Sequence, residues 1–204
     1  VQLWADYIYL DTDERRRFAQ VSHEYLIEQV QRETGTAPTS QKLNFNHPVK
    51  ELIWVVQATT AATQSGTGTS ADDIDATLNV NGTVAAEGND YFCYSSQNNN
   101  DEIINGVSSD EGFGTAKLVL NGHDRFAARN ASYFRTCQPI QAGHKVPSKH
   151  IYNYSFALKP EEHQPSGTCN FSRIDNAKLV FGAVATGTLT VYAVNYNVLR
   201  IMSG

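Results

Sequence analysis

Residues 43–57 read Leu-Asn-Phe-Asn-His-Pro-Val-Lys-Glu-Leu-Ile-Trp-Val-Val-Gln, and this stretch decides the fold class. The run from Leu52 to Val56 is uninterrupted apolar and rich in β-branched and aromatic side chains. A strand of this composition must be covered on both faces, as in a packed sandwich. Pro48 lacks a backbone donor and favours an extended conformation at His47, so this pair is expected to separate two strands rather than lie within one.

Further strand-like segments lie on both sides of this run. Trp4 to Leu10 is dense in aromatic and apolar residues, which predicts a short strand. Residues 21–30 do not keep one period and allow a helix or a strand; we expect a strand because stronger strand signals flank them. Other apolar stretches predict strands over 117–120, 151–158, 178–181 and 188–201. In the last of these, apolar residues fall on both faces, which predicts cover on both sides.

Only short helices are expected. Asp11, followed three residues later by Glu14, is close to a capping box and predicts a helix over 13–19. Residues 125–133 are expected to hold a helical turn, broken by Pro139. No amphipathic helix of a dozen residues alternates with the strands, so a parallel α/β fold is disfavoured. The roughly eight strand candidates predict an all-β, eight-stranded antiparallel sandwich with long surface loops and short helices.

The segment 58–115 differs in character from the rest of the chain. It is dominated by Thr, Ala, Ser, Gly, Asn and Asp, so little of it can bury a large apolar face. Residues 78–84 and 90–94 are expected to add small strands within it. Long ordered loops on a rigid scaffold are where surface function resides, and we expect an exposed, partly self-packed projection.

Composition limits the classes of partner. The chain has 204 residues, enough for one good core, and all-β sandwiches of this size are commonly single domains. Its 16 basic and 21 acidic residues give a net charge of −5, which argues against direct nucleic-acid binding. No run approaches the roughly 18–20 apolar residues that cross a bilayer, so membrane insertion is not expected.

The chain shows no arrangement typical of an active site. Ser166-Gly167-Thr168-Cys169 lacks the G-x-S-x-G elbow of a nucleophile, and helix capping explains the acidic residues Asp11, Asp13 and Glu14. No two histidines have the close spacing along one strand, with a carboxylate following, that a metal site needs: His23, His47, His123, His144, His150 and His163. We therefore expect no enzyme activity, no metal and no cofactor.

Two kinds of surface site remain as candidates. Sequons begin at Asn81, Asn130, Asn153 and Asn170; Asn81 and Asn130 are the candidate glycosylation sites, because chance explains the other two better. The triplet Arg15, Arg16 and Arg17 is usually just a solvated helix face, but in an assembly it becomes a candidate contact between subunits.

Four blocks, in order, carry a family resemblance: Asp11–Gln20 (DTDERRRFAQ), His23–Gln29 (HEYLIEQ), Leu43–Trp54 (LNFNHPVKELIW) and Tyr154–Asp175 (YSFALKPEEHQPSGTCNFSRID). Together they resemble the major capsid proteins of the nucleocytoplasmic large DNA viruses, the group that includes iridoviruses and phycodnaviruses. The blocks cover both ends of the chain, whereas the 58–115 segment matches nothing in the family pattern.

The resemblance implies two tandem antiparallel jelly rolls per polypeptide and three polypeptides per pseudo-hexagonal capsomer. Such capsomers tile an icosahedral shell over an inner membrane. Residues 1–204 would be a single jelly-roll domain, the second of the two, and the start at Val1 is expected of a processed product or a fragment. Implied partners are copies of the same protein, neighbouring capsomers and minor capsid proteins; the implied location is the virion, assembled in the host cytoplasm.

Two alternatives belong to other functional classes. A carbohydrate-binding, lectin-like jelly roll would use Tyr91, Phe92 and Tyr94 beside the polar residues 98–101, because aromatic platforms next to amides suit sugars. The same residues could simply hold a long loop to its scaffold. A metal-dependent jelly-roll enzyme would instead need stoichiometric metal in the purified protein.

Overall fold

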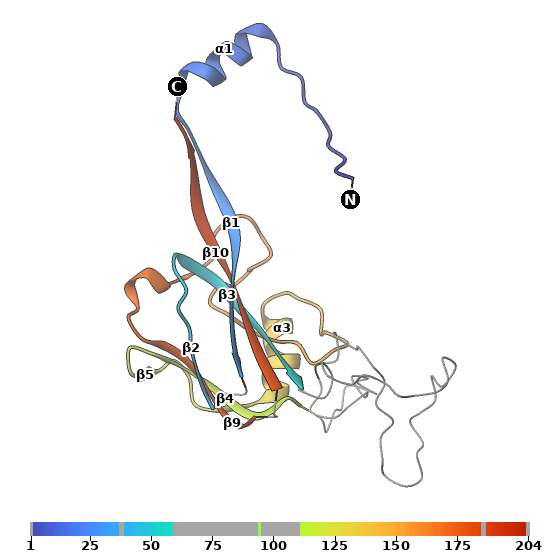
Figure 1. The fold of residues 1–204 in the computed structure, drawn as a ribbon, viewed down its shortest axis with the longest axis vertical. Helices are drawn as coiled ribbons and strands as arrows, with labels where there is room; N and C mark the ends of the chain where they lie inside the picture. Colours follow the sequence, from blue (N-terminus) through green and yellow to red (C-terminus); the bar gives the residue numbers. More distant parts are fainter. Residues whose placement is uncertain (1, 37–38, 59–93, 95–110, 185–186, 203–204) are drawn as a thin grey trace, which may run out of the picture.

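In the computed structural model, the described residues are 2–36, 39–58, 94, 111–184 and 187–202. The elements in these ranges are mainly strands, and Figure 1 shows their arrangement. They are α1 (Thr12–Gln20), β1 (His23–Thr36), β2 (Ser40–Lys42), β3 (Pro48–Ala58), β4 (Phe113–Leu120), β5 (His123–Asp124), β6 (Arg129–Asn130), η2 (Tyr133–Cys137), α3 (Gln138–Gln141), β7 (Tyr152–Ser155), β8 (Cys169–Asn170), η3 (Phe171–Arg173), β9 (Ala177–Val184) and β10 (Gly187–Ile201).

The strands form two antiparallel sheets. One has the order β1-β10-β3-β7, with β8 also pairing with β3. The other has the order β2-β9-β4-β5, with β6 also pairing with β4. The predicted antiparallel sandwich is confirmed. The predicted count of eight strands is not, because the described residues alone carry β1 to β10 and three of these, β5, β6 and β8, are two residues long.

The core lies between the two sheets. Trp54 from β3 is fully buried and packs its ring against Phe113, Phe134 and Tyr152, at centroid distances of 6.3, 5.2 and 6.2 Å. Phe113 in turn meets Phe181 of β9 edge-on at 5.1 Å. Offset and edge-to-face aromatic pairs add to the free energy gained by burying their area. An aromatic cluster therefore joins the two sheets.

Strand β3 is covered on both faces, as its composition predicts. Leu52, Trp54 and Val56 point into the core and are at most 1% exposed. On the opposite face, Ile53 lines a cavity beneath the segment that follows α3, and Val55 is buried. The uninterrupted apolar run is thus explained by cover on both sides.

The backbone of His47 differs from the prediction. Its φ is +67°, in the left-handed region rather than the extended one. Two hydrogen bonds hold it there: the His47 N–H donates to Ser172 Oγ at 2.8 Å, and its carbonyl accepts from the Phe171 N–H at 3.1 Å. Pro48 is the first residue of β3, so the expected separation between strands is confirmed. Tertiary hydrogen bonds have overridden the local preference before proline.

Several predicted elements are confirmed. The helix over 13–19 is α1, with Asp11 as its N-cap, and the segment 21–30 lies in strand β1 from His23 onward rather than in a helix. The other predicted strands correspond to β4, β7, β9 and β10, although β4 and β9 are longer than expected and β7 is shorter.

Two predicted elements differ from the structure. Residues Trp4–Leu10 form no strand and are exposed, and no strand among the described residues pairs with them. The helical turn expected over 125–133 is present only at the end of that range: helical residues begin at Ala131 and run through η2 into α3. Pro139 does not break this segment, since helical residues continue past it to Gln141. Residues 129–130 pair with β4 instead.

The 58–115 segment lies mostly outside the described residues. Strand β3 ends at Ala58 and β4 begins at Phe113, so both ends of the segment lie in strands of the scaffold. The small strands expected over 78–84 and 90–93 fall outside the described residues, and Tyr94 is half-buried and not in a strand.

Candidate functional site

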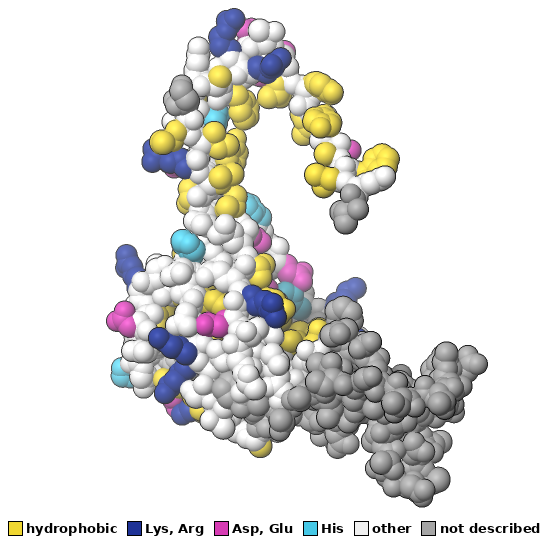
Figure 2. Space-filling model, in the orientation of Figure 1, with side chains coloured by type: hydrophobic (Ala, Val, Ile, Leu, Met, Phe, Trp, Pro, Cys, Tyr) yellow, Lys and Arg dark blue, Asp and Glu magenta, His cyan; other side chains and the backbone are white. Residues whose placement is uncertain are grey.

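An exposed apolar arm stands out from the sandwich. We use this name for residues 2–26 and 198–202, which comprise the first segment, α1 and the far ends of β1 and β10 (Figure 1). Large apolar side chains of the arm are exposed over much of their surface, and Figure 2 shows them gathered along it: Leu3, Trp4, Tyr7, Ile8, Tyr9, Leu10, Phe18, Val21, Tyr25, Leu26, Val198, Leu199, Ile201 and Met202. Patches of this kind mark interaction sites.

The two-stranded part of the arm is apolar on both faces. Tyr25 lies opposite Leu199, and Leu26 lies opposite Val198, so each pair presents apolar surface on one face of the ribbon. All four are exposed, which corrects the expectation that β10 is covered along its whole length. Its first ten residues, up to Tyr196, are largely buried. A two-stranded ribbon is marginal in water without a third layer to pack on.

Helix α1 is also exposed along its whole length. None of its nine residues is buried. The Asp11 side chain accepts a hydrogen bond from the Glu14 N–H at 2.8 Å, and Phe18 stacks on His23 at 4.6 Å. Helices this short are marginal in isolation even when capped. The arm therefore has the composition and geometry of a surface that needs a partner.

A buried charged cluster holds the chain where it returns to the scaffold before β4. Arg135 of η2 donates from Nε and Nη2 to Glu111 Oε1 at 2.9 and 2.8 Å. Tyr152 of β7 donates to Glu111 Oε2 at 2.7 Å and accepts from the Gly112 N–H at 3.0 Å. Burial and then the charge of Glu111 raise the pKa of Tyr152, so its phenol stays a donor. This cluster fixes residues 111–112 against the core.

A histidine joins two loops to strand β3. His144, in the segment after α3, makes hydrogen bonds through Nε2 to Glu51 Oε2 at 2.8 Å and through Nδ1 to Glu161 Oε1 at 2.6 Å. A neutral imidazole has only one N–H, so both contacts are attractive only for the imidazolium. Burial lowers the pKa of His144, but the hydrogen bonds to Glu161 and Glu51 and the charges of both carboxylates outweigh it and raise the pKa.

The His144 contacts predict a pH-dependent contribution to stability. Because the folded pKa is raised above the ordinary 6.5, this contribution is complete below about pH 6.5 and is lost as the pH rises through the folded pKa. Denaturation by urea at several pH values should therefore show that Glu161→Gln loses more stability at pH 6 than at pH 9. As the matched control, Glu162→Gln removes only the Lys159 contact at 2.9 Å. Parallel profiles for both variants would contradict the assignment.

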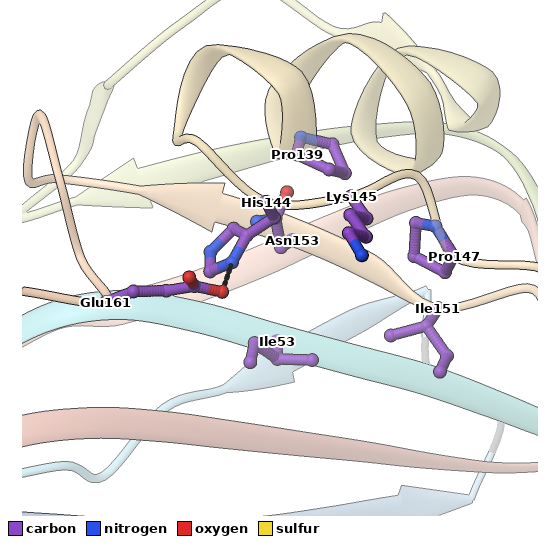
Figure 3. Close-up of a pocket in the computed structure, with 8 residues that line it drawn as sticks. All are labelled: Ile53, Pro139, His144, Lys145, Pro147, Ile151, Asn153 and Glu161. Carbon is purple, nitrogen blue, oxygen red and sulfur yellow. Dashed lines mark hydrogen bonds and ion pairs between the residues drawn. The ribbon is translucent and has the colours of Figure 1, made fainter.

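A cavity of about 220 Å³ lies beside His144, on the outer face of β3 and β7 (Figure 3). Its apolar lining comes from Ile53, Pro139, Pro147 and Ile151, and its polar lining from His144, Lys145, Asn153 and Glu161. The polar residues come from three different segments that only the fold brings together.

The residues predicted from sequence as sites occupy different places. Arg15, Arg16 and Arg17 are exposed on α1, at the tip of the arm, and Arg16 lies 3.9 Å from Asp13. Asn130 is exposed in β6, where its side chain accepts hydrogen bonds from Ser132. Asn81 lies outside the described residues. Neither the contact between subunits nor glycosylation is tested by these positions, and both stay predictions.

The described part of the chain contains no group of three or more His, Cys, Asp or Glu side chains that could hold a metal ion. Helical segments in the same part of the chain are too short or too polar to cross a bilayer. Of the residues proposed for sugar binding, only Tyr94 falls within the described positions.

Sequence comparison identifies relatives over the whole chain. The family model described as large eukaryotic DNA virus major capsid protein matches residues 14–204. The major capsid protein of Pyramimonas orientalis virus is 44% identical over 99% of this chain and 46% of its own length. That of Paramecium bursaria Chlorella virus 1 is 43% identical over 100% of this chain and 52% of its own length. The chain therefore spans about half the length of the curated relatives it matches.

Solved structures show the same fold. The structure of PBCV-1 VP54, fitted into a reconstruction of the virophage Sputnik, matches with a TM-score of 0.69 and 39% identity, over 97% of this chain and 54% of that chain. The Faustovirus major capsid protein matches with a TM-score of 0.56 at 16% identity, over 92% of this chain and 35% of that chain, and shows the fold alone. These matches confirm the predicted jelly-roll class.

None of these relatives is described as a carbohydrate-binding protein, so the lectin-like alternative is unsupported. The relatives carry capsid names, and the family model covers all but the first thirteen residues. Three observations agree with one another: the antiparallel sandwich, the four sequence blocks, and the matches over nearly the whole of this chain. The chain belongs to the family of large eukaryotic DNA virus major capsid proteins.

Proposed function

We propose that this chain is a structural jelly-roll module that self-associates, as part of a longer polypeptide, into trimeric capsomers of an icosahedral virus shell. The observation that carries the proposal is the exposed apolar arm. Its side chains Trp4, Ile8 and Tyr9 are 88%, 88% and 90% exposed, which is unfavourable for a protein that stays alone in water. Obligate assemblies bury large apolar interfaces of this character.

The longer polypeptide would carry a second jelly roll. Support comes from the length of the relatives, of which the chain spans about half, and from the marginal stability of an unpaired ribbon and a nine-residue helix. Packing of the arm against a second domain or against neighbouring copies would cover the ribbon and the helix. On this proposal, Arg15, Arg16 and Arg17 at the tip of the arm contact a neighbouring subunit.

Further parts of the proposal concern the particle. The protein would reside in the virion after assembly in the host cytoplasm, with minor capsid proteins as additional partners and without direct contact to nucleic acid or insertion into the membrane. Its net charge of −5 supports the absence of a nucleic-acid contact. Asn130, which is exposed, remains a candidate for glycosylation, as does Asn81. The function would be structural, without enzyme activity.

The proposal is tested on the full-length protein by light scattering. The unaltered protein should have the mass of three copies. The double variant Leu26→Asp, Val198→Asp places charge on two opposed apolar side chains of the arm and should shift the mass to one copy, with unchanged circular dichroism.

The matched control is Ile140→Asp, which alters an aliphatic side chain that is 63% exposed but lies on α3, away from the arm. It should leave the mass of three copies unchanged. A full-length protein that stays monomeric at high concentration would overturn the proposal, and so would a double variant that assembles normally.

A further inference from the structure

The cavity beside His144 contains a buried acceptor without a donor. Asn153 of β7 is 6% exposed, and its Oδ1 is buried and accepts no hydrogen bond from the described residues. Because Asn153 pairs with Ile53 of β3, both side chains lie on the outer face of the sheet, where they line the cavity. A buried acceptor left unpaired costs about 1–3 kcal/mol, so a donor from water or from a ligand is favoured at this position.

A donor faces the same space. Lys145 lines the cavity, and Figure 3 shows its side chain extending between Asn153 and Pro147 towards the sheet. Its ammonium group makes no ion pair with any described residue, unlike His144 and Glu161, which are paired with each other at 2.6 Å. The cavity thus offers a buried acceptor from Asn153 and a solvent-exposed donor from Lys145 between apolar walls.

The lining sets the chemistry of the occupant. His144 and Lys145 together balance the charges of Glu51 and Glu161, which favours a group without net charge. The volume of about 220 Å³ is smaller than the roughly 300–1,000 Å³ typical of small-molecule sites, and suits one side chain. A peptide group supplies one N–H donor and one carbonyl acceptor. The donor matches the Asn153 Oδ1 acceptor, and the carbonyl matches the Lys145 ammonium donor.

We propose that this cavity binds a polypeptide segment that presents one apolar side chain next to an exposed peptide group. The side chain packs against Ile53, Pro139 and Ile151. The peptide N–H donates to Asn153 Oδ1, and the peptide carbonyl accepts from Lys145 Nζ. This recognition is separate from the apolar arm and stands whether or not the arm mediates assembly.

The test uses capped amino acids and nuclear magnetic resonance of the 204-residue chain. N-acetyl-leucinamide should bind with a dissociation constant on the order of millimolar, as expected for a ligand of this size, and should shift the Asn153 side-chain amide signals. N-acetyl-glycinamide, which lacks the apolar side chain, should bind at least tenfold more weakly. Equal affinities for the two probes would overturn the proposal.

Two variants separate recognition from stability. Asn153→Leu should weaken N-acetyl-leucinamide binding at least tenfold, yet it should not lower the melting temperature, because it removes an unpaired buried polar group. Lys145→Met changes an exposed residue and should weaken binding without affecting the fold. Unchanged affinity in both variants, or a large stability loss in Asn153→Leu, would assign Asn153 to the fold instead.

A peptide distinguishes a polypeptide occupant from a free small molecule. The acetylated and amidated pentapeptide Gly-Gly-Leu-Gly-Gly continues the chain on both sides of the leucine. It should bind at least as tightly as N-acetyl-leucinamide if a chain can enter and leave the cavity. Binding more than tenfold weaker would show that the cavity admits only isolated molecules, and would refute the proposed occupant.

Discussion

Replacing Arg135 with alanine is expected to lower the free energy of unfolding by about 3–5 kcal/mol. The Arg135 side chain is 1% exposed and forms a two-pronged contact with Glu111, whose side chain is 12% exposed. Removing the guanidinium would leave a nearly buried carboxylate with the Tyr152 hydroxyl as its remaining side-chain partner among the described residues. Urea denaturation followed by circular dichroism measures the loss.

The matched control is Lys117→Ala, which removes the exposed ion pair between Lys117 and Asp124 at 2.9 Å. Exposed pairs contribute about 0–1 kcal/mol, so the control should change stability little. Replacing both partners with apolar residues, Arg135→Met with Glu111→Leu, should recover much of the loss, because no charge is then left buried. An Arg135→Ala variant no less stable than Lys117→Ala would contradict the assigned cluster.

Local signals in the sequence were sufficient for the sandwich. The apolar run in β3 required two covered faces and has them, and Asp11 begins α1 as the capping pattern predicts. Both features depend on residues within a few positions of one another. Such patterns can be recognised from the sequence alone, since hydrophobic periodicity and helix capping act within one element.

Features that depend on distant partners could not be predicted. His47 has a positive φ because Phe171 and Ser172, more than 120 positions away, hydrogen bond to its backbone. The strand expected over Trp4–Leu10 fails for the opposite reason: its composition suits a strand, but no strand in the described part of the chain pairs with it. A strand needs a hydrogen-bonding neighbour, which composition alone does not supply.

The candidate sites also divide into local features that the sequence predicts and long-range contacts that it does not. Exposed arginines on a short capped helix were predictable from α1 alone. The His144 contacts join residues separated by 17 and 93 positions, and no sequence motif indicates these contacts. Histidine spacing offers no reason to pair His144 with Glu51, because the pairing arises only when the segment after α3 folds over β3.

Trp54→Ala should produce the other large effect, a loss of about 3–5 kcal/mol in the free energy of unfolding. Trp54 is fully buried and contacts aromatic rings from three other segments, so its removal leaves a cavity that rigid neighbours cannot fill. Its Nε1 is buried without a hydrogen-bond acceptor among the described residues. Trp54→Phe removes this unpaired donor as well as some volume, so it should cost less, on the order of 1–2 kcal/mol.

The chain offers a matched control, because its second tryptophan, Trp4, is 88% exposed on the arm. Trp4→Ala should change the stability of the 204-residue chain by no more than about 0.5 kcal/mol. The same substitution leaves Trp54 as the only tryptophan, so its fluorescence reports unfolding of the core directly. If Trp4→Ala proved as destabilising as Trp54→Ala, the arm would have to pack on the sandwich, and it would then not be available as the surface for self-association.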